Sequence, residues 1–198
     1  MANLSATDVN NTDTHTYTLT SDPSGLFDIS GNQLVVAAGQ TIPDVETVGP
    51  QSYNLSIQVN DGAGGTHTEN VTINLTDVQE TFNLANGGVT FTDQGDAGDT
   101  INGGTGNDII EGDDGNNVIN AGAGNDQVQG SAGSDTLDGG AGALDRLFYS
   151  NDTAGVTLDI GAGTGTGGLA DGDTFSNFEG FVGGSGNDNF IGDGGNHT

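Results

Sequence analysis

Residues 103–111 read GGTGNDIIE, and the same nine-residue pattern follows as GDDGNNVIN (112–120), AGAGNDQVQ (121–129) and GSAGSDTLD (130–138). Further copies are QGDAGDTIN (94–102), GGAGALDRLF (139–148, with one inserted residue), GGSGNDNFI (183–191) and the partial GDGGNHT (192–198). Tandem repetition at a fixed period indicates a fold that stacks copies of one short unit. A flexible glycine linker would have no fixed period.

The sixth and eighth places of the pattern have a constant chemical character. The sixth place is an acid or its amide: Asp99, Asp108, Asn117, Asp126, Asp135, Asp145 and Asp188. The eighth place is apolar: Ile101, Ile110, Ile119, Val128, Leu137, Leu147 and Phe190. We therefore predict that each block is a glycine turn, an acid and a short strand with one buried residue.

The length of the pattern also predicts which residues become neighbours. Two blocks of nine make one turn of 18 residues, so blocks two apart are expected to stack on the same edge. The expected neighbours are Asp108 with Asp126, Asp126 with Asp145, Asp99 with Asn117, and Asn117 with Asp135. Stacked acids repel one another unless a shared divalent cation lies between the turns.

Calcium is the cation that this arrangement favours. Glycine tolerates backbone angles closed to other residues and lets carbonyl groups converge, while six to eight hard oxygen donors at flexible geometry suit calcium better than magnesium. We predict several calcium ions, held by side chains and loop carbonyls of Asp99, Gly103, Thr105, Asp108, Gly112, Asp114, Asn117, Ala121, Ala123, Asp126, Gly130, Ala132, Asp135, Gly139, Ala141, Asp145, Asp173 and Asp188.

The composition supports a fold that depends on ions. Of 198 residues 37 are glycine and 31% are hydrophobic, so a single large apolar core is not expected. One basic residue against 28 acidic ones gives a formal net charge of −27, which excludes nucleic acid and anionic membrane surfaces as partners. There is no cysteine, so neither disulfides nor thiolate metal sites can form.

The first part of the chain follows a different pattern. Strict alternation in SYNLSIQVN (52–60) and NVTINLT (70–76) predicts half-buried strands, and HTYTLT, GLFDIS and QLVVAA predict shorter ones separated by turns. Short strands spaced in this way indicate a β-sandwich. We expect an all-β protein of two domains, 1–80 and 81–198, with the boundary near residues 77–82.

The first domain resembles a bacterial cadherin-like domain. The resemblance is carried by SATDVNNTDTHTYTLT, FDISGNQLVV, IPDVE before YNLSIQVNDG, and VTINLTDVQE. It implies an antiparallel sandwich with calcium held at its ends, while ordinary turn acids are the alternative at both ends. The implied ligands are Asp44, Glu46, Asp77 and Glu80 at the end that faces the second domain, and Asp8, Asn10 and Asp61 at the other.

The second domain resembles the repeats-in-toxin (RTX, hemolysin-type) family, with repeats at 94–147 and 183–198 around a non-repeat segment at 148–182. This resemblance implies a parallel β-roll with calcium between its turns, type I secretion in an unfolded state and folding outside the cell. Asn117 departs from the pattern because it is neutral, so we expect it to weaken two sites.

Together these features predict a non-enzymatic, calcium-dependent structural module, a fragment of a large secreted or surface-anchored bacterial adhesin. Calcium is the expected partner, with an extracellular polysaccharide or another surface protein as a further one, and no membrane insertion. Two alternatives remain open. The chain could be the secretion tail of an exported protease, lipase or polysaccharide epimerase, or a calcium-dependent lectin.

Overall fold

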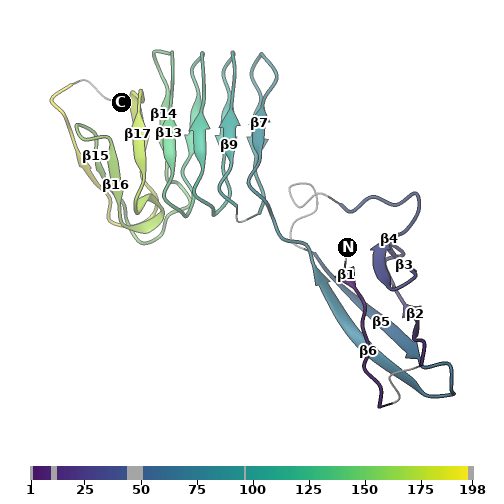
Figure 1. Cartoon of the computed structure of the whole chain (residues 1–198). Coiled ribbons are helices and arrows are strands. Elements are labelled where there is room, and N and C mark those ends of the chain that lie inside the picture. The colour runs from purple at the N-terminus through teal and green to yellow at the C-terminus, as the bar shows by residue number, and fades with distance from the viewer. Residues whose placement is uncertain (1, 10–12, 44–50, 96, 196–198) are drawn as a thin grey trace. The chain divides into compact units, whose positions relative to one another are not determined.

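The computed structural model describes residues 2–9, 13–43, 51–95 and 97–195. The chain separates into two compact units, Met1–Thr76 and Asp77–Thr198. Both units consist of strands, and the second also contains one short 3-10 helix, η1 (Gly168–Ala170) (Figure 1). The predicted all-β class is confirmed. None of the helices in the described ranges has the length and apolar character needed to cross a membrane.

The first unit consists of two antiparallel sheets. Its strands are β1 (Ala2–Asn3), β2 (Thr16–Ser21), β3 (Phe27–Ser30), β4 (Gln33–Val36), β5 (Ser52–Asn60) and β6 (Thr66–Asn74), in the sheet orders β1-β4-β3 and β2-β5-β6. Side chains of both sheets enclose one small core around Leu34, Leu55 and Ile57. The alternation in residues 52–60 buries Leu55 and Ile57 on one face, as predicted.

The second unit is a two-sheet roll of short strands (Figure 1). The five-stranded sheet has the order β18-β14-β12-β10-β8, and the eight-stranded sheet has the order β19-β15-β16-β17-β13-β11-β9-β7. Two strands precede the repeats, β7 (Thr81–Asn83) and β8 (Thr90–Thr92). The strands of the first repeat run are β9 (Thr100–Asn102), β10 (Ile109–Glu111), β11 (Val118–Asn120), β12 (Gln127–Gln129), β13 (Thr136–Asp138) and β14 (Arg146–Phe148).

The strands of the roll pair in parallel at the predicted spacing. Ile110 in β10 lies opposite Val128 in β12, and Ile119 in β11 lies opposite Leu137 in β13. Successive strands therefore alternate between the two sheets, and each sheet gains one strand for every two blocks. This confirms the predicted 18-residue turn.

The eighth-place residues form the core of the roll. Six of them are at most 1% exposed: Ile101, Ile110, Ile119, Val128, Leu137 and Leu147. The prediction is wrong for Phe190, which is 44% exposed. Phe190 lies in β19 (Asn189–Ile191), the edge strand of the eight-stranded sheet, which pairs only with β15 among the described strands, so less of the chain covers it.

The non-repeat segment extends both sheets. It contributes β15 (Thr157–Asp159), β16 (Thr164–Thr166), β17 (Thr174–Ser176) and β18 (Gly180–Val182). β17 and β18 continue the parallel pairing next to β13 and β14, whereas β16 pairs antiparallel with both β15 and β17. The segment is therefore an integral part of the roll, and its strand β16 runs antiparallel to its two neighbours in the eight-stranded sheet.

Candidate metal centres

Two rows of polar residues lie along the roll, each at the point where a loop enters a strand. We name each row after a central member. The Asp126 row precedes strands of the five-stranded sheet and the Asp135 row precedes strands of the eight-stranded sheet. The Asp126 row is Asp108, Asp126, Asp145 and Glu179, and the Asp135 row is Asp99, Asn117, Asp135 and Asp173.

One side-chain oxygen of each residue links it to the preceding turn. In the Asp126 row, the backbone N–H groups of Asp108, Asp126 and Asp145 donate to side-chain oxygens of the next member at 2.7, 2.7 and 2.8 Å. In the Asp135 row, the N–H groups of Asp99, Asn117 and Asp135 do the same at 2.8, 2.9 and 2.8 Å. The predicted neighbours therefore do stack on one another.

The second carboxylate oxygen distinguishes the two rows. In the Asp126 row, Asp108, Asp126 and Asp145 are at most 1% exposed, and their Oδ2 atoms have no hydrogen-bond partner among the described residues. Burial raises the pKa of Asp126 and of Asp145, and the neighbouring carboxylates of the row raise both pKa values further. A buried, unpaired carboxylate is costly, so a cation would supply the partner that these oxygens lack.

Glycines create space beside these oxygens. A Cβ atom on Gly103 would lie 2.9 Å from Asp108 Oδ2 and would overlap the carbonyl oxygen of Ala121. A Cβ on Gly142 would lie 2.5 Å from Asp145 Oδ2 and would overlap the carbonyl oxygen of Gly124. Carboxylate and carbonyl oxygens therefore border the same small spaces. These are the hard donors that calcium prefers, so the residues present fit that ion.

In the Asp135 row, Asn117 provides its own donor. Its Nδ2 group donates to the Asp113 carbonyl at 3.0 Å, to Asp113 Oδ1 at 3.1 Å and to the Gly115 carbonyl at 3.2 Å. A neutral amide thus contacts three oxygens of the kind that a cation binds. The prediction that Asn117 weakens binding gains a structural reason, since the amide satisfies the loop without an ion.

The next two acids of the Asp135 row also receive protein donors. Ser131 Oγ donates to Asp135 Oδ2 at 3.3 Å, and the buried Tyr149 hydroxyl donates to Asp173 Oδ2 at 2.6 Å. Burial raises the pKa of Asp135 to about 7, and burial also raises the pKa of Asp173. A Cβ on Gly130 would overlap the Tyr149 ring, so this ring fills the space beside that glycine.

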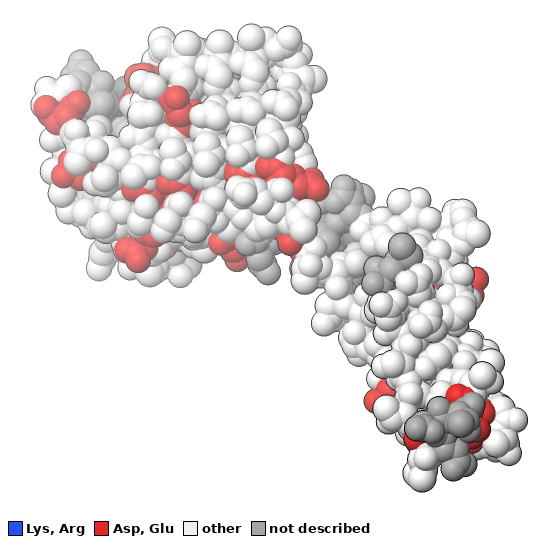
Figure 2. Space-filling view, viewed as in Figure 1, with Lys and Arg blue, Asp and Glu red and all other residues white. Residues whose placement is uncertain are grey.

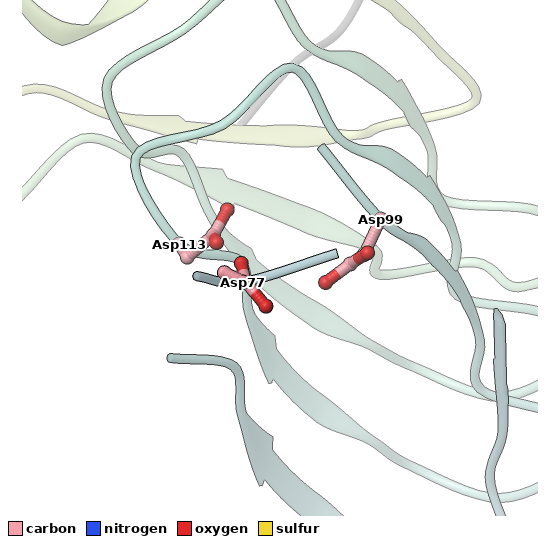
Figure 3. A group of neighbouring side chains, drawn as sticks. All are labelled: Asp77, Asp99 and Asp113. Carbon is pink, nitrogen blue, oxygen red and sulfur yellow. The ribbon is translucent and has the colours of Figure 1, made fainter. Parts of the chain in front are cut away.

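The first member of the Asp135 row, Asp99, lies in a different environment. It forms a cluster with Asp77 and Asp113, in which one ligand oxygen from each residue lies within 4.8 Å of the others (Figure 3). Asp93 lies beside this cluster, where burial and the neighbouring Asp99 raise the pKa of Asp93 to about 7. Asp77 was predicted at the end of the first unit, but it belongs to the second.

The remaining predicted residues of the roll occupy varied positions. Thr105, Ala123 and Ala141 form one column through parallel bridges, and the carbonyls of Ala123 and Ala141 accept backbone N–H groups of the preceding turn. Asp188 accepts the Val156 N–H at 3.0 Å in a separate pair of turns. Glu80 donates its N–H to Asp99 Oδ1. Of the others, Gly112 lies beside Asn117, Gly139 beside Asp145, Ala132 is half-buried and Asp114 is exposed.

The ligands implied by the cadherin resemblance are only partly described. Asp44, Glu46 and Asn10 lie outside the described residues. Asp8 and Asp61 line one pocket of the first unit. Asp61 Oδ1 also accepts the N–H groups of Ala63 and Gly65, both at 2.8 Å, which is the contact of a turn acid.

Sequence reasoning missed Asp93, Asp113, Tyr149 and Glu179. For Glu179 a signal was present, because it stands two residues before Phe181, just as a sixth-place acid stands two residues before its apolar eighth place. Asp113 occupies the second place of its block, which varies between glycine, serine and aspartate. Its position gives no comparable signal.

Comparisons with known proteins identify the repeat. Residues 93–128, 124–143 and 181–196 match the family model of the RTX calcium-binding nonapeptide repeat, present in four copies. The matched residues include five members of the two rows, Asp99, Asp108, Asn117, Asp126 and Asp135. Neither the curated proteins nor the solved structures contain a significant match to the chain.

Proposed function

Because the second unit contains RTX calcium-binding nonapeptide repeats, we propose that this chain is a calcium-dependent structural module of a secreted or cell-surface protein. In this proposal the roll is largely unfolded where calcium is scarce and folds when calcium fills the spaces between its turns. The role is structural and not catalytic.

The observation that carries the proposal is the column of unpartnered oxygens in the Asp126 row. Asp108, Asp126 and Asp145 bury a carboxylate oxygen each, without a protein donor among the described residues. The face of the molecule in Figure 2 displays acidic side chains and no described Lys or Arg, in keeping with the net charge of −27. Divalent cations would offset both the local and the overall repulsion.

Calcium concentration provides the switch in this proposal. Extracellular calcium modules have dissociation constants of about 0.1 to 1 mM, so they are filled outside the cell and empty in the cytosol. RTX repeats are typical of secreted proteins, which supports the same location. A chain with this property could leave the cell unfolded and fold on arrival.

Hydrogen exchange followed by mass spectrometry tests the switch on the full chain, because it reports on the two units separately. We expect peptides from residues 81–195 to be protected in millimolar calcium and to exchange rapidly in chelator. Peptides from β5 and β6 should be protected in both conditions, because their sheets pack on an apolar core. Equal protection of the roll in chelator would contradict the proposal.

We further propose that the parent protein is an adhesin in which calcium stiffens the chain and a polysaccharide or surface protein is the target. The sandwich of two antiparallel sheets supports this over a secretion tail, which needs only the roll. Binding of the immobilised chain to polysaccharides and bacterial surfaces, with and without calcium, tests the adhesive role. A catalytic domain elsewhere in the same gene would instead favour the exported-enzyme alternative.

A further inference from the structure

The cluster of Asp77, Asp99 and Asp113 differs from the repeat sites in the origin of its residues. Asp99 is a sixth-place acid, but Asp77 precedes the first strand of the roll and Asp113 is a second-place residue. Figure 3 shows the three carboxylates gathered from three separate segments of the chain. Neither Asp77 nor Asp113 stands at a position where the repeat pattern supplies an acid.

The spacing of the three carboxylates fits a single calcium ion. One oxygen from each lies within 4.8 Å of the other two. Calcium binds oxygen at about 2.3–2.6 Å, so two oxygens on the same ion can be separated by at most about 5 Å. The oxygens are therefore already close enough to share an ion.

Burial gives a second and independent indication of a ligand. Asp99 is 0% exposed and Asp113 is 7% exposed, and the Oδ2 atoms of both have no hydrogen-bond partner among the described residues. The Oδ1 atoms of the same residues are used, since Asp99 accepts the Glu80 N–H and Asp113 accepts the Gly115 N–H. The protein thus orients the carboxylates of Asp99 and Asp113 through one oxygen each and leaves the second oxygen of each for a partner.

The surrounding backbone holds Asp77 in the cluster. Asp77 Oδ2 accepts the Ala97 N–H at 2.7 Å, and a Cβ on Gly95 would overlap this carboxylate. Glycine at position 95 is therefore required for the close approach of Asp77. The Asn117 Nδ2 group donates to Asp113 Oδ1 at 3.1 Å and so helps to orient the third carboxylate.

We propose that Asp77, Asp99 and Asp113 bind a calcium ion that caps the first turn of the roll. The terminal turn of a stacked fold has a neighbour on one side only, so it frays unless another device holds it. The bound ion joins the segment leading into β7 to the loops before β9 and β11, and so fixes three consecutive turns of the eight-stranded sheet.

This inference rests on the proposed function, since it assumes that calcium is the ligand of the roll, but it is tested separately. Equilibrium dialysis measures the number of calcium ions bound per full-length chain in wild type, Asp77→Asn and Asp113→Asn. Asp171→Asn is the control, because Asp171 also belongs to the second unit but is exposed and outside the cluster. Each substitution removes one negative charge and keeps the shape of the side chain.

We expect Asp77→Asn and Asp113→Asn each to bind one ion fewer than wild type, while Asp171→Asn binds the wild-type number. Hydrogen exchange in calcium should show lost protection in β7 and β8 of the first two variants, with β10 to β14 still protected. This pattern also shows that the variants fold. An unchanged ion count in both cluster variants would overturn the cap, whereas a wild-type chain that binds no calcium would overturn the proposed function as well.

Discussion

The Asp126 row and the Asp135 row share one pattern of hydrogen bonds, from the N–H of each member to a side-chain oxygen of the next, yet the second oxygens of their acids have different partners. In the Asp126 row three buried oxygens have no protein donor among the described residues. In the Asp135 row, after the first turn, an amide, a serine hydroxyl and a tyrosine hydroxyl supply donors. A row of acids in a β-roll is therefore not by itself a row of ion sites. A position is a candidate ion site only where the second carboxylate oxygen has no protein donor.

The largest difference is expected between matched substitutions in the centres of the two rows. Asp126→Asn removes a charge between Asp108 and Asp145, in a row whose Oδ2 atoms have no protein donor among the described residues. The calcium concentration for half-maximal folding should therefore rise at least about tenfold, because even the removal of a group that only supports a metal ligand weakens metal binding by that factor. Asp135→Asn should shift this midpoint little, because Ser131 already donates to that side chain. Calcium titrations followed by circular dichroism measure both midpoints. Equal shifts would remove the distinction between the rows.

The second prediction concerns Tyr149, which donates to Asp173, the last member of the Asp135 row. Tyr149→Phe leaves Asp173 Oδ2 buried without its donor, so the free energy of unfolding in saturating calcium should fall by about 1–3 kcal/mol. Chemical denaturation of the full chain measures the change. Tyr53→Phe removes the same atom in the first unit and should leave the unfolding transition of the roll unchanged. An unchanged free energy of unfolding in Tyr149→Phe would mean that an ion or solvent reaches Asp173.

A third substitution should remove one of the protein donors of the Asp135 row and so create an ion site there. Asn117→Asp exchanges the amide donor for a carboxylate, so the chain should bind one additional calcium ion. Equilibrium dialysis counts the ions. Asn116→Asp, at the exposed neighbouring position, adds the same charge and serves as the control. An unchanged ion count would show that the Asn117 amide is not the only group that keeps an ion out of this position.

The smallest effect is expected from pH in calcium-free buffer. Asp93 and Asp135 have pKa values raised to about 7, against about 3.9 in an unfolded chain. The folded roll therefore binds more protons than the unfolded chain between these values, so its stability is greatest below about pH 4 and falls as the pH rises to about 7. Hydrogen exchange in chelator at pH 5, 6 and 7, corrected for the intrinsic rates, should show weak protection of the roll at pH 5 that is lost by pH 7. Asp135→Asn should make this dependence shallower.

Much of the fold could be predicted from the sequence because the repeat is local. An acid followed two residues later by an apolar side chain defines a strand such as that of Ile110 or Val128, and the block length determines which strands pair. Glycine at position 103 follows from the same pattern, because a side chain there would crowd Asp108.

The protein donors to the acids of the Asp135 row could not be predicted in this way. Tyr149 reaches Asp173 across the roll, and no short pattern relates the two residues before the fold is known. The cap cluster has the same property, since Asp77, Asp99 and Asp113 meet only after three turns have stacked. Phe190 shows the converse case, in which the local pattern is intact but an edge strand leaves the side chain exposed.

The hydrogen bonds of the rows also determine where the stack stops. The N–H of Asp126 donates to Asp145, and the carbonyl of Asp126 accepts the N–H of Arg146, so each turn requires the one that follows it. At Asp173 the N–H instead donates to the carbonyl of Ala170, and the carbonyl accepts the N–H of Gly165. The segment of β16 and η1 thus provides the hydrogen-bond partners that a further repeat would otherwise supply, and the Asp135 row ends there. The number of blocks before this segment sets the number of residues in the row, so a chain with more blocks would have a longer row.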